Sequence, residues 1–358
     1  VAGRATGEAF PFAQGIFPTS NNTYLPVSAS RTGVLLFERG GNAGDAGSYG
    51  NTGGVNQIAW FDRSGKSLGE IVSGGVQDSS LSPDEKFIAY RRSPRLSASD
   101  IRIRDLARGT ETRFTSDLSV NSVPVWSPKS DRIVFTSNRT NASNRTTAFN
   151  LYLKASGGTG QEELLTAGIN GQFPMQWSQD GRLIVYTEQA SKTKQDIWVL
   201  PIDVPPPDRK PRLFLGTEFN ETQGQLSPDA NWIAFSSDRS GRFEIYVRPF
   251  PAGQQEFTIS SAGGRQPRWR ADGKELFFVD PNGKLMSVPV KISPGAKQSF
   301  EAGVPVPLFD MRPVDFLNAF QYNVTADGKR FLVTSQIRGS AGSPPVTVVT
   351  NWQAELKK

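Results

Sequence analysis

Five aspartates recur at one position of a repeated turn motif, and they are the first candidates for chemistry in this sequence. The five are Asp84, Asp180, Asp229, Asp272 and Asp327. A ring of carboxylates suits metal binding or proton transfer. However, an aspartate in a tight turn accepts hydrogen bonds from nearby backbone N–H groups, so its recurrence once per motif favours a structural role in the turn. We therefore assign no catalytic residue.

The chain of 358 residues contains no histidine and no cysteine. This composition excludes a serine-histidine-acid triad, imidazole or thiolate metal ligands and disulfide bonds. The Asp-x-Asp-x-Asp-Gly spacing of a calcium loop is also missing. We expect no metal and no cofactor.

One stretch, QLSPDANWIAFSSDRSGRFEIYVRPF at 225–250, is the clearest copy of a repeated unit. It predicts a short strand, a tight turn, an apolar strand and an alternating third strand, with a fourth strand at 256–260. Seven turns of this kind recur along the chain, in ASRTGVLLF (29–37), LSPDEKFIAY (81–90), WSPKSDRIVF (126–135), WSQDGRLIVY (177–186), LSPDANWIAF (226–235), WRADGKELFF (269–278) and VTADGKRFLV (324–333).

A four-stranded unit repeated with variable loops is typical of a β-propeller. We predict a single all-β domain over residues 1–358, with seven four-stranded antiparallel blades. Six blades is the alternative if the first copy, which has the poorest turn, is not a blade. The predicted blades span approximately 27–74, 76–117, 120–167, 172–217, 222–262, 265–312 and 320–352.

The last predicted blade lacks a fourth strand because the chain ends. Residues 7–16, GEAFPFAQGI, are similar to the predicted fourth strand at 303–311. We expect this N-terminal strand to complete the last blade and close the ring, which removes an open sheet edge. Trp126, Trp177 and Trp269 begin innermost strands, where packing between blades is favoured over stacking on a sugar.

Long loops between second and third strands are predicted at 38–56, 91–99, 137–149 and 187–195, all on one face of the ring. Basic residues gather in and near these loops, and arginine is suited to bind carboxylates and phosphates. The candidate ligand-binding residues are Arg91, Arg92, Arg95, Arg139, Arg145, Lys192, Lys194, Asp238, Arg239, Arg242 and Arg338. A solvated loop face remains the alternative.

The formal net charge is +6, but the 40 basic residues are spread among 34 acidic ones. Because no basic stripe is present, we do not expect nucleic-acid binding. No run of eighteen apolar residues exists either, so no membrane span is predicted.

The repeat resembles the WD40-like, TolB-like (PD40-type) propellers, in particular the propeller region of acidobacterial membrane-anchored serine/threonine protein kinases. The resemblance is carried by residues 226–251, 265–290, the N-terminal GEAFPFAQGI and the terminal VTVVTNWQAELKK (346–358). It implies a bacterial, extracytoplasmic domain that follows a membrane segment. The sequence lacks the glycine-rich loop, His-Arg-Asp and Asp-Phe-Gly motifs of a kinase, so this chain cannot transfer phosphate.

These observations predict a non-enzymatic module that binds an anionic small molecule, a glycan or a protein, with a monomer expected. Two alternatives stay open. One is a carbohydrate-active propeller enzyme that uses two free carboxylates at the channel mouth. The other is a scaffold for protein assembly, which a large exposed apolar patch would indicate.

Overall fold

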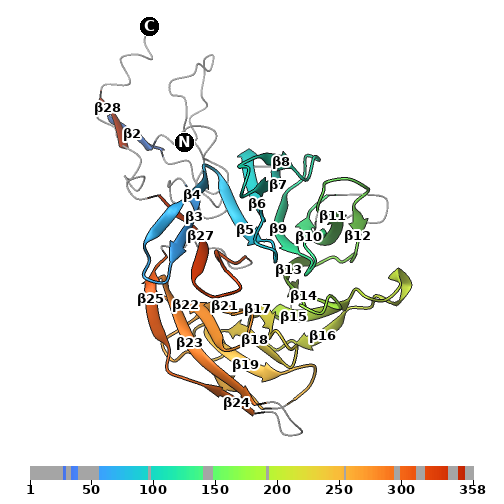
Figure 1. Cartoon of the computed structure of the whole chain (residues 1–358). Helices are drawn as coiled ribbons and strands as arrows, with labels where there is room; N and C mark the ends of the chain where they lie inside the picture. Colours follow the sequence, from blue (N-terminus) through green and yellow to red (C-terminus); the bar gives the residue numbers. More distant parts are fainter. Residues whose placement is uncertain are drawn as a thin grey trace, which may run out of the picture.

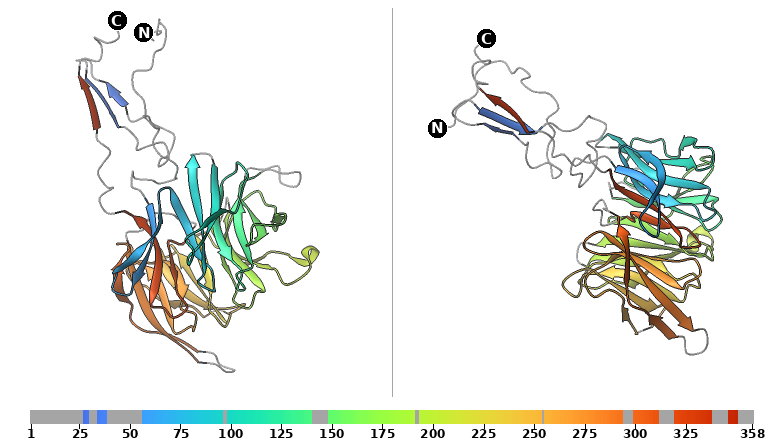
Figure 2. Two further views of the ribbon diagram at one scale, coloured as in Figure 1. Left: turned by 45° about the horizontal axis from the view of Figure 1, so that its top comes forward. Right: turned by 60° about the vertical axis from the view of Figure 1, so that its left-hand side comes forward.

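The computed structural model shows a ring of β-sheets with one smaller sheet beside it (Figure 1, Figure 2). The structure describes residues 27–29, 34–38, 56–95, 98–139, 148–190, 193–253, 255–293, 299–311, 319–337 and 346–350. Within these ranges six antiparallel sheets radiate from a common centre, and the innermost strand of each lies at that centre (Figure 1). The chain is a six-bladed β-propeller.

Blades 2 to 5 are consecutive four-stranded meanders, as the sequence predicts. Blade 2 contains β5(Val76–Leu81), β6(Phe87–Arg95), β7(Ala98–Asp105) and β8(Glu111–Arg113), and blade 3 contains β9(Asn121–Trp126), β10(Arg132–Ser137), β11(Asn150–Ala155) and β12(Glu163–Leu164). Blade 4 contains β13(Gly171–Trp177), β14(Leu183–Ala190), β15(Lys194–Pro201) and β16(Arg212–Leu215), and blade 5 contains β17(Glu221–Leu226), β18(Trp232–Ser237), β19(Glu244–Pro249) and β20(Phe257–Thr258). A 3-10 turn, η1(Pro206–Asp208), precedes β16.

Blade 6 carries an additional strand that the sequence did not predict. Its four regular strands are β21(Arg265–Trp269), β22(Glu275–Val279), β23(Lys284–Ser293) and β25(Val306–Asp310). The second half of β23 pairs with β24(Ser299–Ala302), so this hairpin extends beyond the blade (Figure 1). Phe300 of β24 packs against Trp232 of blade 5, which joins the two blades outside their usual contact.

Blade 1 is assembled from two distant parts of the chain. Its inner strands are β26(Tyr322–Val324) and β27(Arg330–Gln336), and its outer strands are β3(Asn56–Asp62) and β4(Ser67–Ser73). Strands β27 and β3 pair over seven residues, from Arg330 opposite Asp62 to Gln336 opposite Asn56. This pairing closes the ring, whereas we predicted closure by residues 7–16, which lie outside the described residues.

The prediction of seven blades is wrong, and the alternative of six is confirmed. The first predicted copy forms β1(Val27–Ala29) and β2(Val34–Glu38), and β2 pairs with β28(Val346–Thr350) in a separate three-stranded sheet. The blade predicted at 320–352 would use residues 346–351 as its third strand. That position is taken by β3, which has the alternating pattern of a third strand and is followed directly by the fourth.

Two of the four predicted long loops are regular strands. In blade 2, β6 and β7 leave only residues 96 and 97 between them, and in blade 4, β14 and β15 leave only 191–193. Both segments continue the antiparallel pairing, from Arg92 opposite Asp100 to Arg95 opposite Ala98 in blade 2, and from Glu188 opposite Asp196 to Ala190 opposite Lys194 in blade 4. The loop at 137–149 is present at its start and end, but most of it, like the 38–56 segment, lies outside the described residues.

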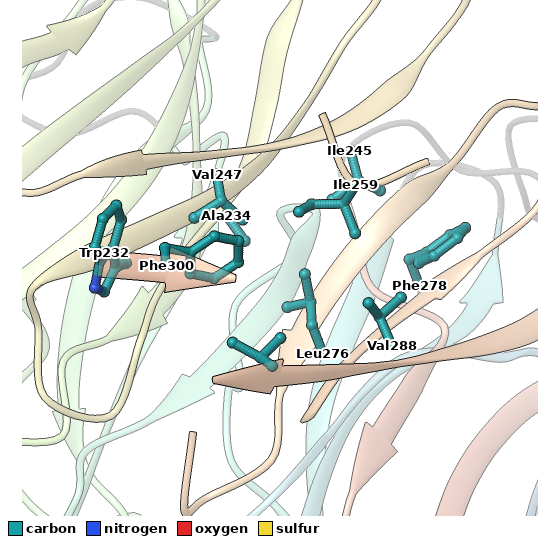
Figure 3. Packing of buried hydrophobic residues seen from close by; sticks show 10 residues of the cluster. Trp232, Ala234, Ile245, Val247, Ile259, Leu276, Phe278, Val288 and Phe300 are labelled. Atoms are coloured by element: carbon teal, nitrogen blue, oxygen red, sulfur yellow. The ribbon is translucent and has the colours of Figure 1, made fainter. Parts of the chain in front are cut away.

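The hydrophobic core is divided into one cluster at each of the six blade junctions, with a seventh cluster at the centre. Strand β18 shows why its apolar run is continuous. Ile233 and Phe235 face blade 4, while Trp232 and Ala234 face blade 6, because successive side chains of a strand point to opposite faces. Figure 3 shows the cluster between blades 5 and 6.

Candidate functional site

The hydrogen bonds confirm a structural role for the turn aspartates. In blade 4 the hydroxyl of Ser178 donates to Asp180 at 2.6 Å, and the same carboxylate accepts the backbone N–H of Arg182 at 3.0 Å. Ser227 and Asp229 repeat this arrangement in blade 5, at 2.5 Å. Carboxylates committed in this way are not available for acid–base chemistry.

The pKa values of these carboxyl groups agree with that role. At Asp272 the Arg270 guanidinium is the main cause of a lowered pKa. At Asp180 burial raises the pKa, but hydrogen bonds from Ser178 and Arg182 outweigh it, so the net pKa is also lowered. Both groups are therefore held as carboxylates, which accept hydrogen bonds in the turn.

The main cavity lies at the centre of the ring and opens on the face that carries these turns. Its volume is about 410 Å³, and residues of all six inner strands line it. The rim is formed by turn residues such as Pro83, Gln179 and Ala271, while Val123, Met175 and Phe320 of the central cluster lie deeper. A mouth built by every blade at the axis of the ring is a recess that can take a ligand.

β-Bulges in the inner strands shape the cavity wall. Asp78, Val123, Gln223 and Gln266 adopt φ values of 50°, 49°, 59° and 61°, each beside a register shift in its sheet. A bulge re-aims the side chain that it carries. The side-chain oxygen of Gln223 accepts the N–H of Gln266 at 2.8 Å, so the bulges also join neighbouring blades.

The three tryptophans that begin innermost turns have both a packing contact and a surface in the cavity. Trp126 and Trp269 donate their indole N–H groups to backbone carbonyls of the preceding blade, at 3.0 Å each. Trp177 donates to Gly181 of its own turn at 3.0 Å. All three line the cavity. The expected packing role is confirmed, since Trp126 and Trp177 are each only 5% exposed.

Arg268 of β21 is the functional candidate that the sequence interpretation missed. Its guanidinium lies 4.1 Å from the ring centre of Phe320 and 6.0 Å from that of Tyr322, and it lines the cavity. Its Nε atom is buried without a hydrogen-bond partner, and the Arg268 side chain forms no hydrogen bond or ion pair with any residue that the structure describes. Desolvation lowers the pKa of Arg268 to about 10, although Tyr322 opposes this shift, so the group is still charged at neutral pH.

A comparison of the six repeats would have revealed Arg268. The residue before the last inner-strand position is Ser80, Val125, Gln176, Gln225 or Asn323 in the other blades. Only blade 6 has a charged side chain there.

The loop arginines that we predicted as ligand-binding residues are ion-paired within the protein. Arg139 pairs with Asp117 at 2.8 Å and also with Glu162, and its guanidinium lies 4.7 Å from the ring centre of Tyr152. Arg239 has the same two kinds of contact in blade 5, since its guanidinium lies 3.8 Å from the ring centre of Tyr246 and pairs with Glu256. Recurrence in two blades indicates a structural role for both.

The remaining members of that set divide into paired and undescribed residues. Arg91 pairs with Asp78 at 3.2 Å, Arg92 with Glu111 at 3.5 Å, and Arg242 with Glu244 at 2.7 Å. Asp238 accepts two hydrogen bonds from Asn220, at 2.9 and 2.6 Å, and Lys194 lies 5.9 Å from the ring centre of Phe219. The side chain of Arg95, and all of Arg145, Lys192 and Arg338, lie outside the described residues. Anion binding by this face stays a prediction.

At the edge between blades 4 and 5, the buried side chain of Asp196 is in an environment that disfavours its charged form. Burial is the main cause that raises the pKa of Asp196, and the nearby charge of Glu188 adds to it, while the Thr193 hydroxyl opposes it. The Oδ1 atom of Asp196 is buried without a hydrogen-bond partner. The folded state therefore favours the protonated acid, and ionisation at neutral pH destabilises the fold.

We expect Asp196→Asn to stabilise the protein at pH 7, on the order of 1 kcal/mol. A carboxyl group whose pKa is raised on folding costs stability above its folded pKa, and this cost disappears as the pH falls below the unfolded value of about 4. Urea denaturation from pH 7 to 3 should show the advantage of the variant shrinking to zero. The exposed Asp208→Asn is the control, and an advantage that is independent of pH would contradict this explanation.

Two further findings concern metal binding and membrane-spanning helices. In the described ranges, no group of three or more acidic side chains is placed to hold a metal ion. None of the described helical segments is long and apolar enough to cross a membrane.

The comparison with solved structures gives the same fold. A TolB-type protein of Agrobacterium tumefaciens superposes with a TM-score of 0.59 at 18% identity, over 79% of this chain and 98% of that one. An oligogalacturonate lyase in complex with manganese gives 0.53 at 13% identity, over 93% and 97%, and the lyase of Vibrio parahaemolyticus gives 0.51 at 13%, over 88% and 95%. No protein-family model and no curated protein sequence matches the chain.

The chain is thus an all-β propeller with a central cavity that is open on one face. More particularly, its fold is TolB-like, as the repeat motifs predicted. Identities below 20% extend this likeness to the fold alone.

Proposed function

We propose that this protein is a binding module whose ligand or partner segment enters the central cavity from the turn face. The observation that carries the proposal is the cavity itself, because all six blades line it and it contains a charged side chain without a partner. The loop face of the ring offers arginines that are already paired, so the turn face is the better candidate.

The resemblance to kinase-linked propellers supports a place outside the cytoplasm, where the module would sense or bind for a membrane-anchored partner. The TolB-like fold is consistent with that location. A rigid ring that presents one recess suits such a role, because the blades hold the lining residues in place before the ligand arrives.

A carbohydrate-active enzyme is less well supported. The two described carboxylates that line the cavity are Asp78 and Glu85. Asp78 pairs with Arg91 at 3.2 Å, and Glu85 pairs with Arg330 at 3.2 Å and accepts the N–H of Ala326 at 2.8 Å. Because both acids are engaged, the described channel mouth lacks the free carboxylate pair that glycoside hydrolysis needs.

An indole placed on the rim should block the cavity. Ala271 is exposed at the rim, so Ala271→Trp is expected to leave stability within about 0.5 kcal/mol. In a thermal-shift screen of peptides, glycan fragments and organic acids, compounds that raise the melting temperature of the parent protein should lose their effect on this variant.

The matched control is Ser240→Trp, which places the same side chain on an exposed loop of the opposite face. Compounds that still bind Ala271→Trp but fail on Ser240→Trp would place the site on the loop face and overturn the proposal.

A further inference from the structure

We infer that the ligand of this cavity is a monocarboxylate, and that its carboxylate pairs with Arg268. This inference rests on the proposed function, since it names the chemistry of what the cavity binds. The carboxylate has two possible sources, a free organic acid or the acidic side chain of a peptide.

The charged side chains of the cavity wall are paired with one exception, Arg268. Of the four charged residues that line the cavity within the described ranges, three are compensated: Asp78 by Arg91, Glu85 by Arg330, and Arg270 by Asp272 at 2.7 Å and Glu275 at 2.9 Å. Only Arg268 lacks a partner of opposite charge within the part of the chain that the structure describes. The cavity therefore has one positive charge to offer.

The unpaired guanidinium of Arg268 is suited to bind a carboxylate. Arg268 is half-buried, and an unpaired charge that is partly removed from water is costly, while the contact with the face of Phe320 returns only part of that cost. A planar guanidinium binds a planar carboxylate through two parallel hydrogen bonds, which is the pairing that its fork of N–H donors fits best. A structural role would have provided this partner from within the chain, as happens for Arg63, Arg139 and Arg239.

The nature of the wall limits the ligand further. A phosphate monoester carries close to two negative charges at neutral pH and would exceed the single charge available. Trp126, Trp177 and Trp269 line the cavity, together with Pro83, Pro124, Pro128, Pro174 and Pro228. Polar residues, among them Ser79, Gln176 and Asn323, line it as well, so the wall suits an acid whose body has both apolar and polar groups, and about 410 Å³ is within the range of small-molecule pockets.

The test compares acids with their neutral amides. Ligand-observed NMR, followed by calorimetry, would measure binding of benzoate, hippurate and hippuramide to the intact chain. An acetylated, amidated Ala-Trp-Glu-Ala peptide and its Glu→Gln counterpart would form the second arm. We expect an acid to bind at least about tenfold more tightly than its amide, because hydrogen bonds to charged groups contribute about 1.5–3 kcal/mol.

The variant Arg268→Met should abolish the preference for the acid, whereas Arg212→Met on the exposed outer strand β16 should not change it. Arg268→Met should also be at least as stable as the parent, because it removes an unpaired charge. A destabilised Arg268→Met would instead mean that its contact with Phe320 holds the central cluster together, and it would overturn the inference.

The outcomes separate the two proposals. If acid and amide bind equally and Ala271→Trp blocks both, the cavity binds ligands but Arg268 is not their anchor. If none of the acids or peptides binds at 10 mM, the carboxylate inference is wrong, and the rim variants in the broader screen still decide the proposed function. Preference for the peptide alone would assign the carboxylate to a protein partner.

Discussion

Replacing Trp232 with alanine should cost about 3–5 kcal/mol of unfolding free energy, the largest loss that we expect from a single substitution in this chain. Trp232 is 1% exposed and lies in the cluster between blades 5 and 6. Its ring lies beside that of Phe300 (Figure 3), with the ring centres 5.3 Å apart, and its ring centre is 5.9 Å from that of Phe257. Removing the indole would leave a cavity between β18 and the β23–β24 hairpin, which the closed ring has little freedom to fill.

Chemical denaturation would measure this loss. Trp232→Phe keeps an aromatic ring in the cluster and removes an indole N–H that has no hydrogen-bond partner, so its cost should stay below about 1.5 kcal/mol. Leu213→Ala, at a side chain that is 51% exposed, is the surface control. Equal losses for alanine and phenylalanine at position 232 would show that packing against Phe300 is not the cause.

Glu275→Ala should destabilise the protein by about 2–3 kcal/mol, because it breaks the ion-pair network that joins blade 6 to the ring-closing blade. Arg63 donates from both Nη atoms to Glu275, at 2.6 and 3.2 Å, and Arg270 donates at 2.9 Å. Breaking a buried ion pair costs about 3–5 kcal/mol, and we expect less here because the Arg63 side chain is 38% exposed.

The pH dependence identifies the ion pairs as the cause. Burial raises the pKa of Glu275, but the hydrogen bonds and charges of Arg63 and Arg270 outweigh it, so the net pKa is lowered. A carboxyl group with a lowered pKa stabilises the fold above its unfolded value of about 4.3, and this contribution is lost as the pH falls through the folded pKa. The stability difference between parent and Glu275→Ala should therefore be constant from pH 7 to 5 and shrink below about 4.

Glu301→Ala is the matched control for this network, since Glu301 is 67% exposed and lies 4.0 Å from Lys291. Its effect should stay within about 0.5 kcal/mol at every pH. A Glu275→Ala defect that persists unchanged at pH 3 would mean that lost packing, rather than lost charge, is responsible.

The sequence predicted the blade plan well because each blade repeats the same local chemistry. The turn serine and aspartate, the apolar second strand and the alternating third strand are set by neighbours in the sequence, so blades 2 to 5 could be placed from the pattern. The number of blades could not be predicted in the same way, because it depends on whether β3 pairs with β2 or with β27. The pairing with β27 joins residues that are more than 260 positions apart in the sequence.

The site was harder to predict than the fold for a related reason. Exposed loops rich in arginine drew attention to one face, but whether Arg139 or Arg239 has an acidic partner depends on contacts between separate strands. Arg268 was overlooked because a single arginine in a strand has no distinctive spacing. Arg268 stands out because its side chain has no acidic partner among the described residues, and only the three-dimensional structure can show this.

The composite first blade has a consequence for how the molecule is made. Because β27 pairs with β3, the ring cannot close until residues up to Gln336 have left the ribosome, by which time blades 2 to 5 have been synthesised in full. Contacts of such high sequence separation form late and slowly. In the meantime β3 and the innermost parts of an unclosed arc expose edges that favour association between chains. Newly made copies are thus most vulnerable to aggregation in the interval before the last two inner strands arrive.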